Sequence, residues 1–433
     1  MSAGLVLVVF FVLLALSVPI FGALGITSVF PSLLNPSFSA NGIFLVREML
    51  GGINSFPLLA IVMFILSGII MSRGGVSRKL FNFFCYFLGE IPAGMPCCVI
   101  VTCLFYGAIS GSAPATVAAV GSMTIPVLIE LGYEKPFSTA LVVVAGGLGV
   151  IIPPSIPFVL YCMATGESVG DLFIAGILPG FLIAFCLMGY AIYYCKRKGE
   201  DKQKIREVVG GLRTKGFFQV LKDSIWALFT PVIILGSIYS GIASPTEAAV
   251  LSVIYALIIS IFVYRTLKIS ELMNIFVEAI NTYAPMLFLI AAANGFARVL
   301  TLLRVPQTVS ETILTTFGGN KAAILLVINL FLLVVGMLID LGPAVLILAP
   351  IFAPMMTELG VDLIHFGIIM VVNLAIGFVT PPVGVNLYVG SRLSGVPVVT
   401  IAKNAVGFLL LFAVALALLV IFPEISLVLV GRA

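Results

Sequence analysis

Long uncharged stretches constrain the fold of this chain more than any other feature of its sequence. A helix that crosses the hydrocarbon core of a bilayer needs roughly 20 predominantly apolar residues. Runs of that length without Asp, Glu, Lys or Arg recur, and they include residues 2–46, 49–72, 91–129, 172–195, 225–246 and 404–423. Since 61% of the 433 residues are hydrophobic and 9% are charged, too little polar surface remains for soluble domains. The sequence therefore predicts an all-α polytopic membrane protein.

The distribution of basic residues predicts the orientation of the chain in a bacterial inner membrane. Nine of the 22 Lys and Arg residues lie between Lys196 and Lys222. By the positive-inside rule this segment is expected to be a solvated cytoplasmic loop, and no nucleic-acid partner is expected for it. The first apolar run lacks the charged region of a signal peptide, so we expect a retained helix. Counting spans from the loop predicts a cytoplasmic N-terminus and a periplasmic C-terminus.

An internal repeat at a fixed offset of 228 residues adds a second constraint. The aligned features are Pro57 and Pro285, Pro126 and Pro354, Glu-Leu-Gly at 130–132 and 358–360, and Gly-x-x-x-Pro-Pro at 149–154 and 377–382. An odd number of predicted spans separates the copies, so the second is expected upside down, as in the inverted repeats of secondary transporters. We predict a first repeat at 1–195, a cytoplasmic loop at 196–222 and a second repeat at 223–433.

Each repeat contains one apolar segment that is too long and too broken for a single helix. Residues 91–130 carry GAISGSAPAT at their middle, and residues 322–358 carry GMLIDLGPAV. Backbone that leaves helical hydrogen bonding inside a membrane must be buried in protein or line a wet cavity, because unpaired polar groups are costly in hydrocarbon. Both segments are predicted to be re-entrant hairpins. Each is followed by a helix that a Pro-Pro pair breaks, at 137–163 and at 362–390.

The hairpin tips and the broken helices together predict two cation sites. A proline lacks an N–H and displaces the carbonyl four residues before it, so two in succession free several carbonyl oxygens at one depth. Such oxygens, with nearby hydroxyl groups, suit a hard cation such as Na+. The residues available at the first site are Ser110, Ser112 and the carbonyls of 149–154, and those at the second are Gly336, Asp340, Thr380 and the carbonyls of 377–382.

The same features predict a site for an anionic substrate. Half-helix N-termini that point from both tips toward the middle of the membrane would attract an anion. The residues assigned to this substrate are Thr116, Ser155, Gly342 and Asn386. The alternative is that the glycines and prolines only permit close helix packing and kinks. Two copies of one motif at a fixed offset favour the site.

Isolated charges near these segments leave alternatives open. Asp340 is the one charged residue between 322 and 356, and a lone charge in the membrane is costly unless it is paired. It is therefore either a cation ligand or partner, which we favour, or a protonated bystander. Arg298, Arg304 and Arg392 lie near predicted span ends and could bind a carboxylate, although such side chains usually snorkel to the interface.

The sequence lacks the motifs of the obvious enzymatic alternatives. It contains no GxxxxGK[ST] loop for ATP phosphates and no HExxH zinc site. Ser110 and Ser112 have no His or Lys near them in their own hairpin that could activate a nucleophile. An enzyme, an ATP-driven pump and an organic cofactor are therefore not expected.

Five segments together resemble the large membrane subunit of tripartite ATP-independent periplasmic (TRAP) transporters. They are GAISGSAPAT, GGLGVIIPPSIP, GIASPTEAAV, GMLIDLGPAVLILAP and NLAIGFVTPPVGVNLYV. The resemblance implies an elevator mechanism, in which the hairpins and broken helices move as one unit against a scaffold. It also implies two or more bound Na+ ions. Their implied ligands are Ser110, Ser112, Gly149, Ile152 and Pro154 at one site, and Gly336, Gly377, Thr380 and Val383 at the other.

The resemblance further implies two protein partners. They are a small four-helix membrane subunit and a periplasmic substrate-binding protein that delivers an organic acid, such as a C4-dicarboxylate or sialic acid. A stand-alone ion-coupled anion transporter and an anion channel remain open as alternatives. Uptake by this chain alone would reveal the first, and a conductance without sodium coupling would reveal the second.

Overall fold

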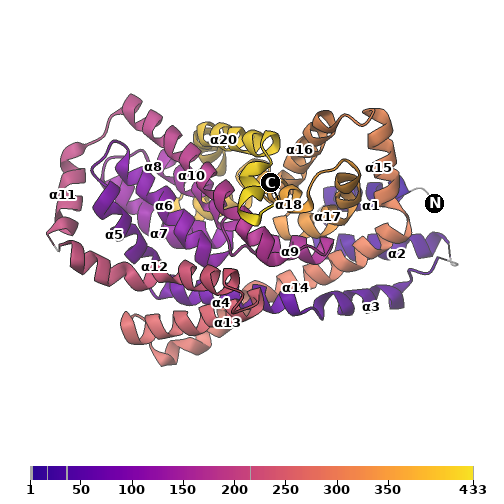
Figure 1. Cartoon of the computed structure of the whole chain (residues 1–433), viewed down its shortest axis with the longest axis horizontal. Coiled ribbons are helices and arrows are strands. Elements are labelled where there is room, and N and C mark those ends of the chain that lie inside the picture. The colour runs from indigo at the N-terminus through magenta and orange to yellow at the C-terminus, as the bar shows by residue number, and fades with distance from the viewer. Residues whose placement is uncertain (1–2, 17, 36–37, 215, 433) are drawn as a thin grey trace.

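A computed structural model of the chain describes residues 3–16, 18–35, 38–214 and 216–432. The regular elements within these ranges are all helices, in agreement with the predicted all-α class. Nine of the described helices are long and apolar enough to cross a membrane by length and composition. Most of the described helices, long and short, pack into two groups (Figure 1).

The first group, here called the α4/α14 layer, runs along the lower edge of Figure 1. α13 packs against α4 and α12, and α14 packs against α3 and α4. The members are α3 (Gly42–Ile53), α4 (Phe56–Arg73), α12 (Phe217–Tyr239), α13 (Pro245–Ile258) and α14 (Leu272–Leu302). Large apolar side chains such as Phe218, Ile242 and Met273 are exposed on this layer. Helices with apolar residues on their exposed faces are typical of a surface that meets lipid.

The second group, here called the broken-helix bundle, contains the two proline-broken segments at its centre. Almost every residue of these segments before the break is buried, from Phe137 to Ala145 and from Ile364 to Gly377. The members are α6 (Gly94–Ser110), α7 (Ala113–Glu130), α8 (Lys135–Ala145), η1 (Gly146–Val150), α9 (Ile156–Thr165), α10 (Val169–Lys198), α16 (Lys321–Leu338), α17 (Leu341–Glu358), α18 (Leu363–Gly377), α19 (Val385–Ser394) and α20 (Val398–Ile421).

Two amphipathic helices join the groups. α5 (Val76–Leu88) connects α4 to α6, and α15 (Val305–Thr316) connects α14 to α16. The remaining short elements are η2 (Ile259–Val263), η3 (Ile269–Glu271), α21 (Glu424–Leu427) and η4 (Val428–Val430).

The helix bounds repeat at the offset seen in the sequence. α7 and α17 begin and end 228 residues apart, and α5, α6 and α9 match α15, α16 and α19 to within one residue. The cis peptide bonds Pro153–Pro154 and Pro381–Pro382 follow the same offset. The two halves also interlock, because α9 packs against α17 and α19 packs against α7. We call α6–α7 and α16–α17 the first and second helical pairs. α9, which follows the first break, thus lies on the second pair, and α19, which follows the second break, lies on the first pair.

Two segments differ from the prediction. The first apolar run forms two helices rather than one, α1 (Ala3–Ala15) and α2 (Ile20–Leu34), and Pro19 caps the second. Proline provides no N–H for helical hydrogen bonding, so a break at this point follows from its chemistry. The segment expected as a loop at 196–222 contains α11 (Lys202–Arg213), which Asp201 caps by accepting from the Lys204 N–H.

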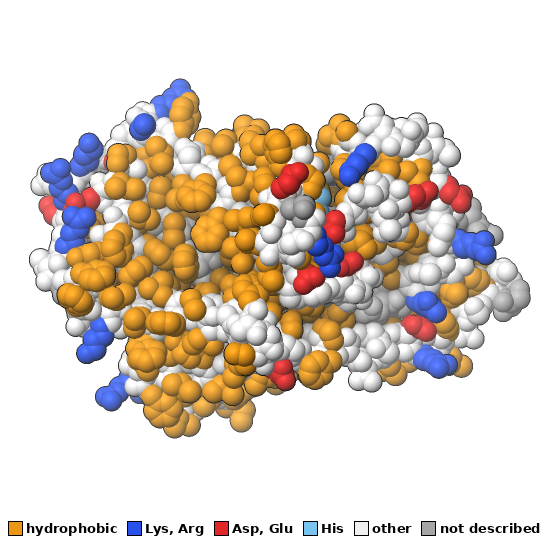
Figure 2. All heavy atoms as spheres, in the orientation of Figure 1, with side chains coloured by type: hydrophobic (Ala, Val, Ile, Leu, Met, Phe, Trp, Pro, Cys, Tyr) orange, Lys and Arg blue, Asp and Glu red, His pale blue; other side chains and the backbone are white. Residues whose placement is uncertain are grey.

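Charge is distributed unevenly along the molecule. Figure 2 shows charged side chains at both ends of this face, with basic ones most prominent at the end where Figure 1 places α5 and α11, whereas hydrophobic side chains dominate the middle. The separation of a basic end from an apolar middle is typical of a membrane protein with a defined orientation.

Candidate functional site

The turn between α6 and α7, here called the first tip, brings predicted cation ligands together. Gly111 has φ +61°, a left-handed conformation that favours glycine and lets the chain reverse within two residues. The hydroxyl oxygens of Ser110 and Thr116 lie 2.9 Å apart, and the Thr116 hydroxyl donates to the Ser112 carbonyl at 2.8 Å. Two hydroxyl groups and one carbonyl oxygen therefore converge at this tip.

The broken segment of the first half lies directly on the first tip. A β-carbon built on Gly149 would fall 2.4 Å from the Thr116 hydroxyl oxygen and 2.8 Å from the Ser112 carbonyl oxygen. A β-carbon on Gly111 would fall 2.9 Å from the Pro154 carbonyl oxygen. Contacts this short leave no room for side chains, so both glycines are required. The tip and break residues predicted for the first cation site thus meet in the folded chain.

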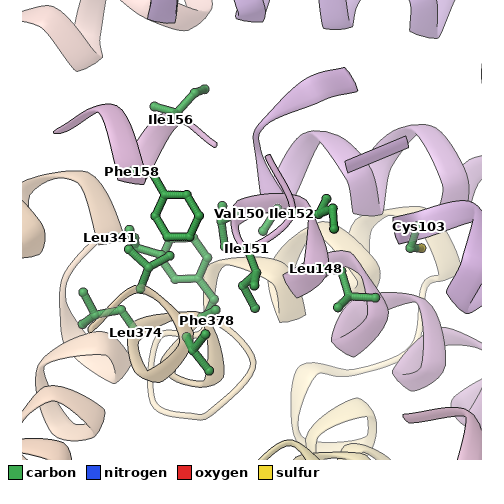
Figure 3. Close-up of a cluster of buried hydrophobic side chains, with 14 of the residues drawn as sticks. Cys103, Leu148, Val150, Ile151, Ile152, Ile156, Phe158, Leu341, Leu374 and Phe378 are labelled. Carbon is green, nitrogen blue, oxygen red and sulfur yellow. The ribbon is translucent and has the colours of Figure 1, made fainter. Parts of the chain in front are cut away.

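Ser155 and Ile152 complete the first break. The Ser155 hydroxyl donates to the Val150 carbonyl at 2.5 Å and accepts from the Phe158 N–H at 3.4 Å, which caps α9. Ile152 is buried beside Gly107 of α6, where its Cγ2 would lie 3.2 Å from an added β-carbon. Figure 3 shows the apolar surroundings of this break, in which Val150 and Ile151 lie near Phe378 of the other half.

The turn between α16 and α17, here called the second tip, meets the second break in a similar way. A β-carbon built on Gly377 would fall 2.4 Å from the carbonyl carbon of Gly336 and 2.7 Å from its oxygen. The Val383 N–H donates to the Met337 carbonyl at 3.2 Å. Backbone of α16 therefore lies against backbone of the break, with Thr380 between Gly377 and Val383. Of the predicted ligands of the second cation site, Gly336, Gly377 and Val383 are thus neighbours.

Asp340 is the N-cap of α17. Its Oδ1 accepts from the Leu341 N–H at 2.8 Å, and its side chain is exposed. Within the described ranges, no basic side chain forms an ion pair with Asp340. The Thr380 hydroxyl donates to the Ile376 carbonyl at 2.8 Å, which leaves its oxygen free to accept or to bind a cation.

Both tips open into one cavity of about 550 Å³, here called the substrate cavity. It lies between the broken-helix bundle and helices α4 and α14. Its lining includes Ser110, Gly111 and Ser112 from the first tip and Asp340, Leu341 and Gly342 from the second. The N-terminal turns of α7 and α17 thus face one space, and their helix dipoles favour an anion there.

The residues predicted to bind substrate are not all at this cavity. Gly342 lines it, whereas Thr116, Ser155 and Asn386 are buried in the bundle. Asn386 donates from Nδ2 to the Val143 carbonyl of α8 at 3.2 Å, so it joins the two halves. Its role and those of Thr116 and Ser155 as substrate ligands stay predictions.

Sequence reasoning missed the residues that the α4/α14 layer contributes. Arg73 at the end of α4 pairs with Glu278 near the start of α14, with 2.8 Å between Arg73 Nε and Glu278 Oε2. Glu278 lines the substrate cavity, and so do Ser72 and Thr282. None of these residues belongs to a motif or to the features that match at the 228-residue offset. Only the packing of α4 against α14 brings them to the tips.

The two halves differ in exposure. Residues 149–155 of the first break are buried, whereas Pro381, Pro382 and Val383 of the second are exposed. Ala115 and Ala118 of α7 are exposed, although their counterparts in α17 are buried where α17 packs against α14 and α15. Helices α14 and α15 therefore cover α17 of the second pair, whereas this face of α7 in the first pair remains exposed.

The donor set fits an alkali cation better than a transition metal. Among the described residues, no group of three or more His, Cys, Asp or Glu side chains could hold a metal. Carbonyl and hydroxyl oxygens at both tips remain, and oxygen ligands suit hard cations.

Sequence relatives of this chain are transporter permeases. It is similar to the isethionate TRAP transporter permease protein DctMQ of Oleidesulfovibrio alaskensis, with 45% identity over 88% of this chain and 59% of that protein. It is 41% identical to the C4-dicarboxylate TRAP transporter large permease protein DctM of Pseudomonas aeruginosa over 86% of each chain. It is 34% identical to the sialic acid TRAP transporter large permease protein SiaM of Vibrio cholerae over 89% of each. The chain thus spans less than two thirds of the first relative and most of the other two.

Solved structures of membrane transporters share the fold. The match with the crystal structure of the Alcanivorax borkumensis YdaH transporter covers 92% of this chain and 90% of the YdaH chain, with a TM-score of 0.59 and 16% identity. The match with the structure of Neisseria gonorrhoeae MtrF covers 93% of this chain and 94% of the MtrF chain, with a TM-score of 0.64 and 13% identity. These likenesses concern the fold alone, and they confirm the predicted all-α polytopic membrane class.

The family assignment follows from the length of the match. Residues 7–425 match the family described as tripartite ATP-independent periplasmic transporter, DctM component. That match covers nearly the whole chain, and the relatives agree with it. The chain therefore belongs to the DctM family of tripartite ATP-independent periplasmic transporter components.

Proposed function

We propose that this chain is the large permease of a TRAP transporter and carries a small organic acid inward across the bacterial inner membrane, coupled to Na+. The observation that carries the proposal is the convergence of both tips and both breaks on one cavity. That convergence supplies oxygen ligands for cations beside two helix N-termini that attract an anion.

Coupling follows from the position of the two proposed cation sites. Ser110, Ser112, Gly149, Ile152 and Pro154 supply the first, and Gly336, Asp340, Gly377, Thr380 and Val383 supply the second. A cation at the second site offsets the unpaired charge of Asp340 beside the substrate cavity. An organic anion then binds more tightly when the cations are bound, and reciprocity requires that the anion tightens cation binding equally.

The basic end of the molecule supports a cytoplasmic location for α5 and α11 (Figure 2). In this orientation α4 ends in the cytoplasm at Arg73, and the start of α10 is periplasmic. Arg432 pairs with Asp171 at that start, with 3.0 Å between Arg432 Nη2 and Asp171 Oδ2, which favours a periplasmic C-terminus.

The same orientation argues against the cytoplasmic N-terminus expected from the sequence. Phe10 stacks on Phe296, with ring centroids 5.3 Å apart. Phe296 lies within two turns of the outer end of α14 and far from its cytoplasmic start at Leu272. Seven helical residues span only about 10 Å, so we infer that Ala3 lies in the outer half of the membrane or beyond it.

The unequal exposure of the two helical pairs supports an elevator with an inward-open cavity. In this orientation the exposed residues of α7, together with Ser72 and Glu278, lie on the cytoplasmic side. We infer that α6–α7 and α16–α17 are re-entrant hairpins of one moving unit, the broken-helix bundle. The α4/α14 layer is then the scaffold, and in the opposite state it covers α7 and uncovers α17.

The relatives support the substrate class and the partners. Three of them are named for isethionate, C4-dicarboxylate and sialic acid, which are all small organic anions. The family description is tripartite and periplasmic. We infer that this chain works with a small membrane subunit and a periplasmic substrate-binding protein.

Thermal unfolding of the purified chain in NaCl and KCl of equal ionic strength tests the cation sites. A bound ion stabilises the native state by RT ln(1 + [L]/Kd), about 2.7 kcal/mol at a hundredfold excess over Kd. We expect a melting temperature that rises with Na+ and not with K+, and a smaller rise in Ser110→Ala and Thr380→Ala. Thr124→Ala is the matched control, because Thr124 makes the same hydroxyl bond to a carbonyl four residues earlier but lies away from both tips. Identical wild-type curves in the two salts would contradict sodium coupling.

Transport by reconstituted vesicles separates the alternatives. We expect uptake of an organic acid only with an inward Na+ gradient and a binding protein. Uptake by this chain alone would indicate a stand-alone transporter, and an anion conductance without Na+ would indicate a channel.

A further inference from the structure

A second cavity, here called the outer chamber, continues the seam that contains the substrate cavity. It holds about 380 Å³ and lies between helices of the α4/α14 layer and helices of the broken-helix bundle. Three helices line both cavities in the same order. The substrate cavity touches 278–289 of α14, 156–160 of α9 and 341–342 of α17, and the outer chamber touches 294–301, 163–164 and 346–350 of the same helices. The two cavities are therefore consecutive spaces along one interface.

A buried layer separates the two spaces. Ile290 of α14, Val345 of α17 and Tyr161 of α9 lie between them in sequence and are all buried. Movement of α17 along α14 would remove this layer. In the proposed orientation the outer chamber is then the entrance to the seam from the periplasm.

Arg298 of α14 supplies the basic group of the outer chamber. It is the one Lys or Arg among the described residues that line it, and its side chain is exposed. It forms no ion pair with any described acidic side chain, including Glu48 in the same chamber. A guanidinium offers five N–H donors in a planar fork that matches a carboxylate. An arginine that only snorkelled to the interface would not need a polar-lined chamber around it.

Two further polar groups lie on the same face of α14. Asn294 and Thr301 are four residues before and three residues after Arg298, which is the spacing of one helix face. Asn294 donates to the Ile290 carbonyl at 3.0 Å and Thr301 donates to the Ala297 carbonyl at 2.9 Å, so the oxygens of both side chains remain available as acceptors. Gly52 of α3 fixes Asn294, since a β-carbon on Gly52 would fall 2.7 Å from its side chain.

We propose that the outer chamber is a receiving site for the transported organic acid, in which Arg298 binds a carboxylate before the seam opens. This inference rests on the proposed function. The chamber presents one cationic group, and the carboxylate of Glu48 and the oxygens of Asn294 and Thr301 accept hydrogen bonds. A monocarboxylate with hydroxyl groups fits this set better than a dicarboxylate, because a second carboxylate would meet Glu48.

Cysteine labelling in membrane vesicles tests the receiving site. Ala164→Cys is the outer reporter, since Ala164 lines the chamber without a polar side chain. The native cysteines are buried apart from the half-buried Cys186, so an unsubstituted chain gives the background. Ser72→Cys is the reporter for the substrate cavity. The probes are gluconate, N-acetylneuraminate and succinate, with chloride as the ionic control, and the label is a membrane-impermeant maleimide applied from the matching side.

We expect a hydroxylated monocarboxylate, gluconate or N-acetylneuraminate, to slow labelling of Ala164→Cys at a lower concentration than succinate. Adding Arg298→Gln should raise the half-protecting concentration about tenfold or more, and Arg298→Lys should raise it less. Arg304→Gln is the matched control, because Arg304 begins α15 outside the chamber, and it should change nothing. Melting temperatures of all variants show whether they fold.

Two results would overturn the receiving site while leaving the transporter intact. The first is protection of Ser72→Cys without protection of Ala164→Cys, and the second is equal protection of Ala164→Cys with and without Arg298→Gln. Better protection by succinate would overturn the preference for a hydroxylated monocarboxylate. If no probe protects either reporter, the receiving site fails, whereas the proposed function fails only if uptake is absent with both a Na+ gradient and a binding protein.

Discussion

Tyr106 of α6 donates a hydrogen bond from its hydroxyl to the carbonyl oxygen of Gly68 in α4, across 3.2 Å. The bond joins the broken-helix bundle to the α4/α14 layer at the first tip. Gly68 permits this approach, because a β-carbon there would fall 3.2 Å from the Ser110 Cα. If the bundle slides against the layer, this contact must break.

Tyr106→Phe should therefore shift the conformational equilibrium. A net hydrogen bond contributes about 0.5–1.5 kcal/mol, which corresponds to a two- to tenfold change in the population ratio. We expect faster labelling of Ala164→Cys from the outer side. Tyr255→Phe is the matched control, because its hydroxyl donates to the Trp226 carbonyl at 2.8 Å within the α4/α14 layer. That variant should lower the melting temperature without changing labelling, and equal effects of the two variants would contradict the sliding contact.

Gly377→Ala should damage the second cation site. The added methyl group would overlap the backbone of Gly336, and overpacking of this kind costs about 1–3 kcal/mol. We expect a lower melting temperature and a smaller response to Na+. Gly189→Ala in α10 is the control, because nothing lies within 4 Å of its added β-carbon. A Gly377→Ala variant with a wild-type Na+ response would remove this contact from the cation site.

The repeat explains which features the sequence could predict. Helices such as α7 and α17 follow from apolar runs and from proline positions at a constant offset, so their bounds could be read within a few residues. A glycine at 336 or 377 indicates that another segment packs closely there, but it does not indicate which residue that is, so the contact between Gly336 and Gly377 could not be predicted from the glycines alone. The positions of Glu278 and Arg298 depend on how α14 packs across the bundle. Local sequence does not encode that packing, so the contribution of α14 to the two cavities could not be predicted.

Glu200→Ala should destabilise the end of the α6–α7 pair that lies opposite the first tip, here called the base, where α6 starts and α7 ends. The Glu200 carboxylate accepts from the Ala93 N–H at 2.9 Å and from the Tyr133 hydroxyl, so it ties the start of α6 to the residues after α7. Hydrogen bonds to a charged group contribute about 1.5–3 kcal/mol, and local opening should rise about tenfold or more. Hydrogen exchange of peptides covering 91–97 and 128–134 measures it. Glu207→Ala, on the exposed face of α11, is the control. Unchanged exchange at both peptides would show that other contacts hold the base.

Acidification should weaken a second contact at the same base. The hydrogen bond from Lys198, aided by the Tyr194 hydroxyl, holds the pKa of the Glu134 carboxyl below its usual value of 4.5. A lowered folded-state pKa gives stability that is present above the usual value and is lost as the pH falls through the lowered pKa. Because the pair is exposed, its contribution is small. The melting-temperature difference between wild type and Lys198→Gln should shrink as the pH falls below 4.5. Lys196→Gln is the control, and a difference that is constant with pH would contradict the assignment.

The interlocked packing of the two halves constrains how the chain can be assembled. α7, at 113–130, packs against α19, at 385–394, so its partner is synthesised long after it has left the ribosome. α9 likewise packs against α17, which is synthesised later than α9. Until the second half is inserted, these faces of the first half meet lipid or insertion machinery instead of protein. A chain truncated between the halves would keep them unmatched and present them to membrane proteases.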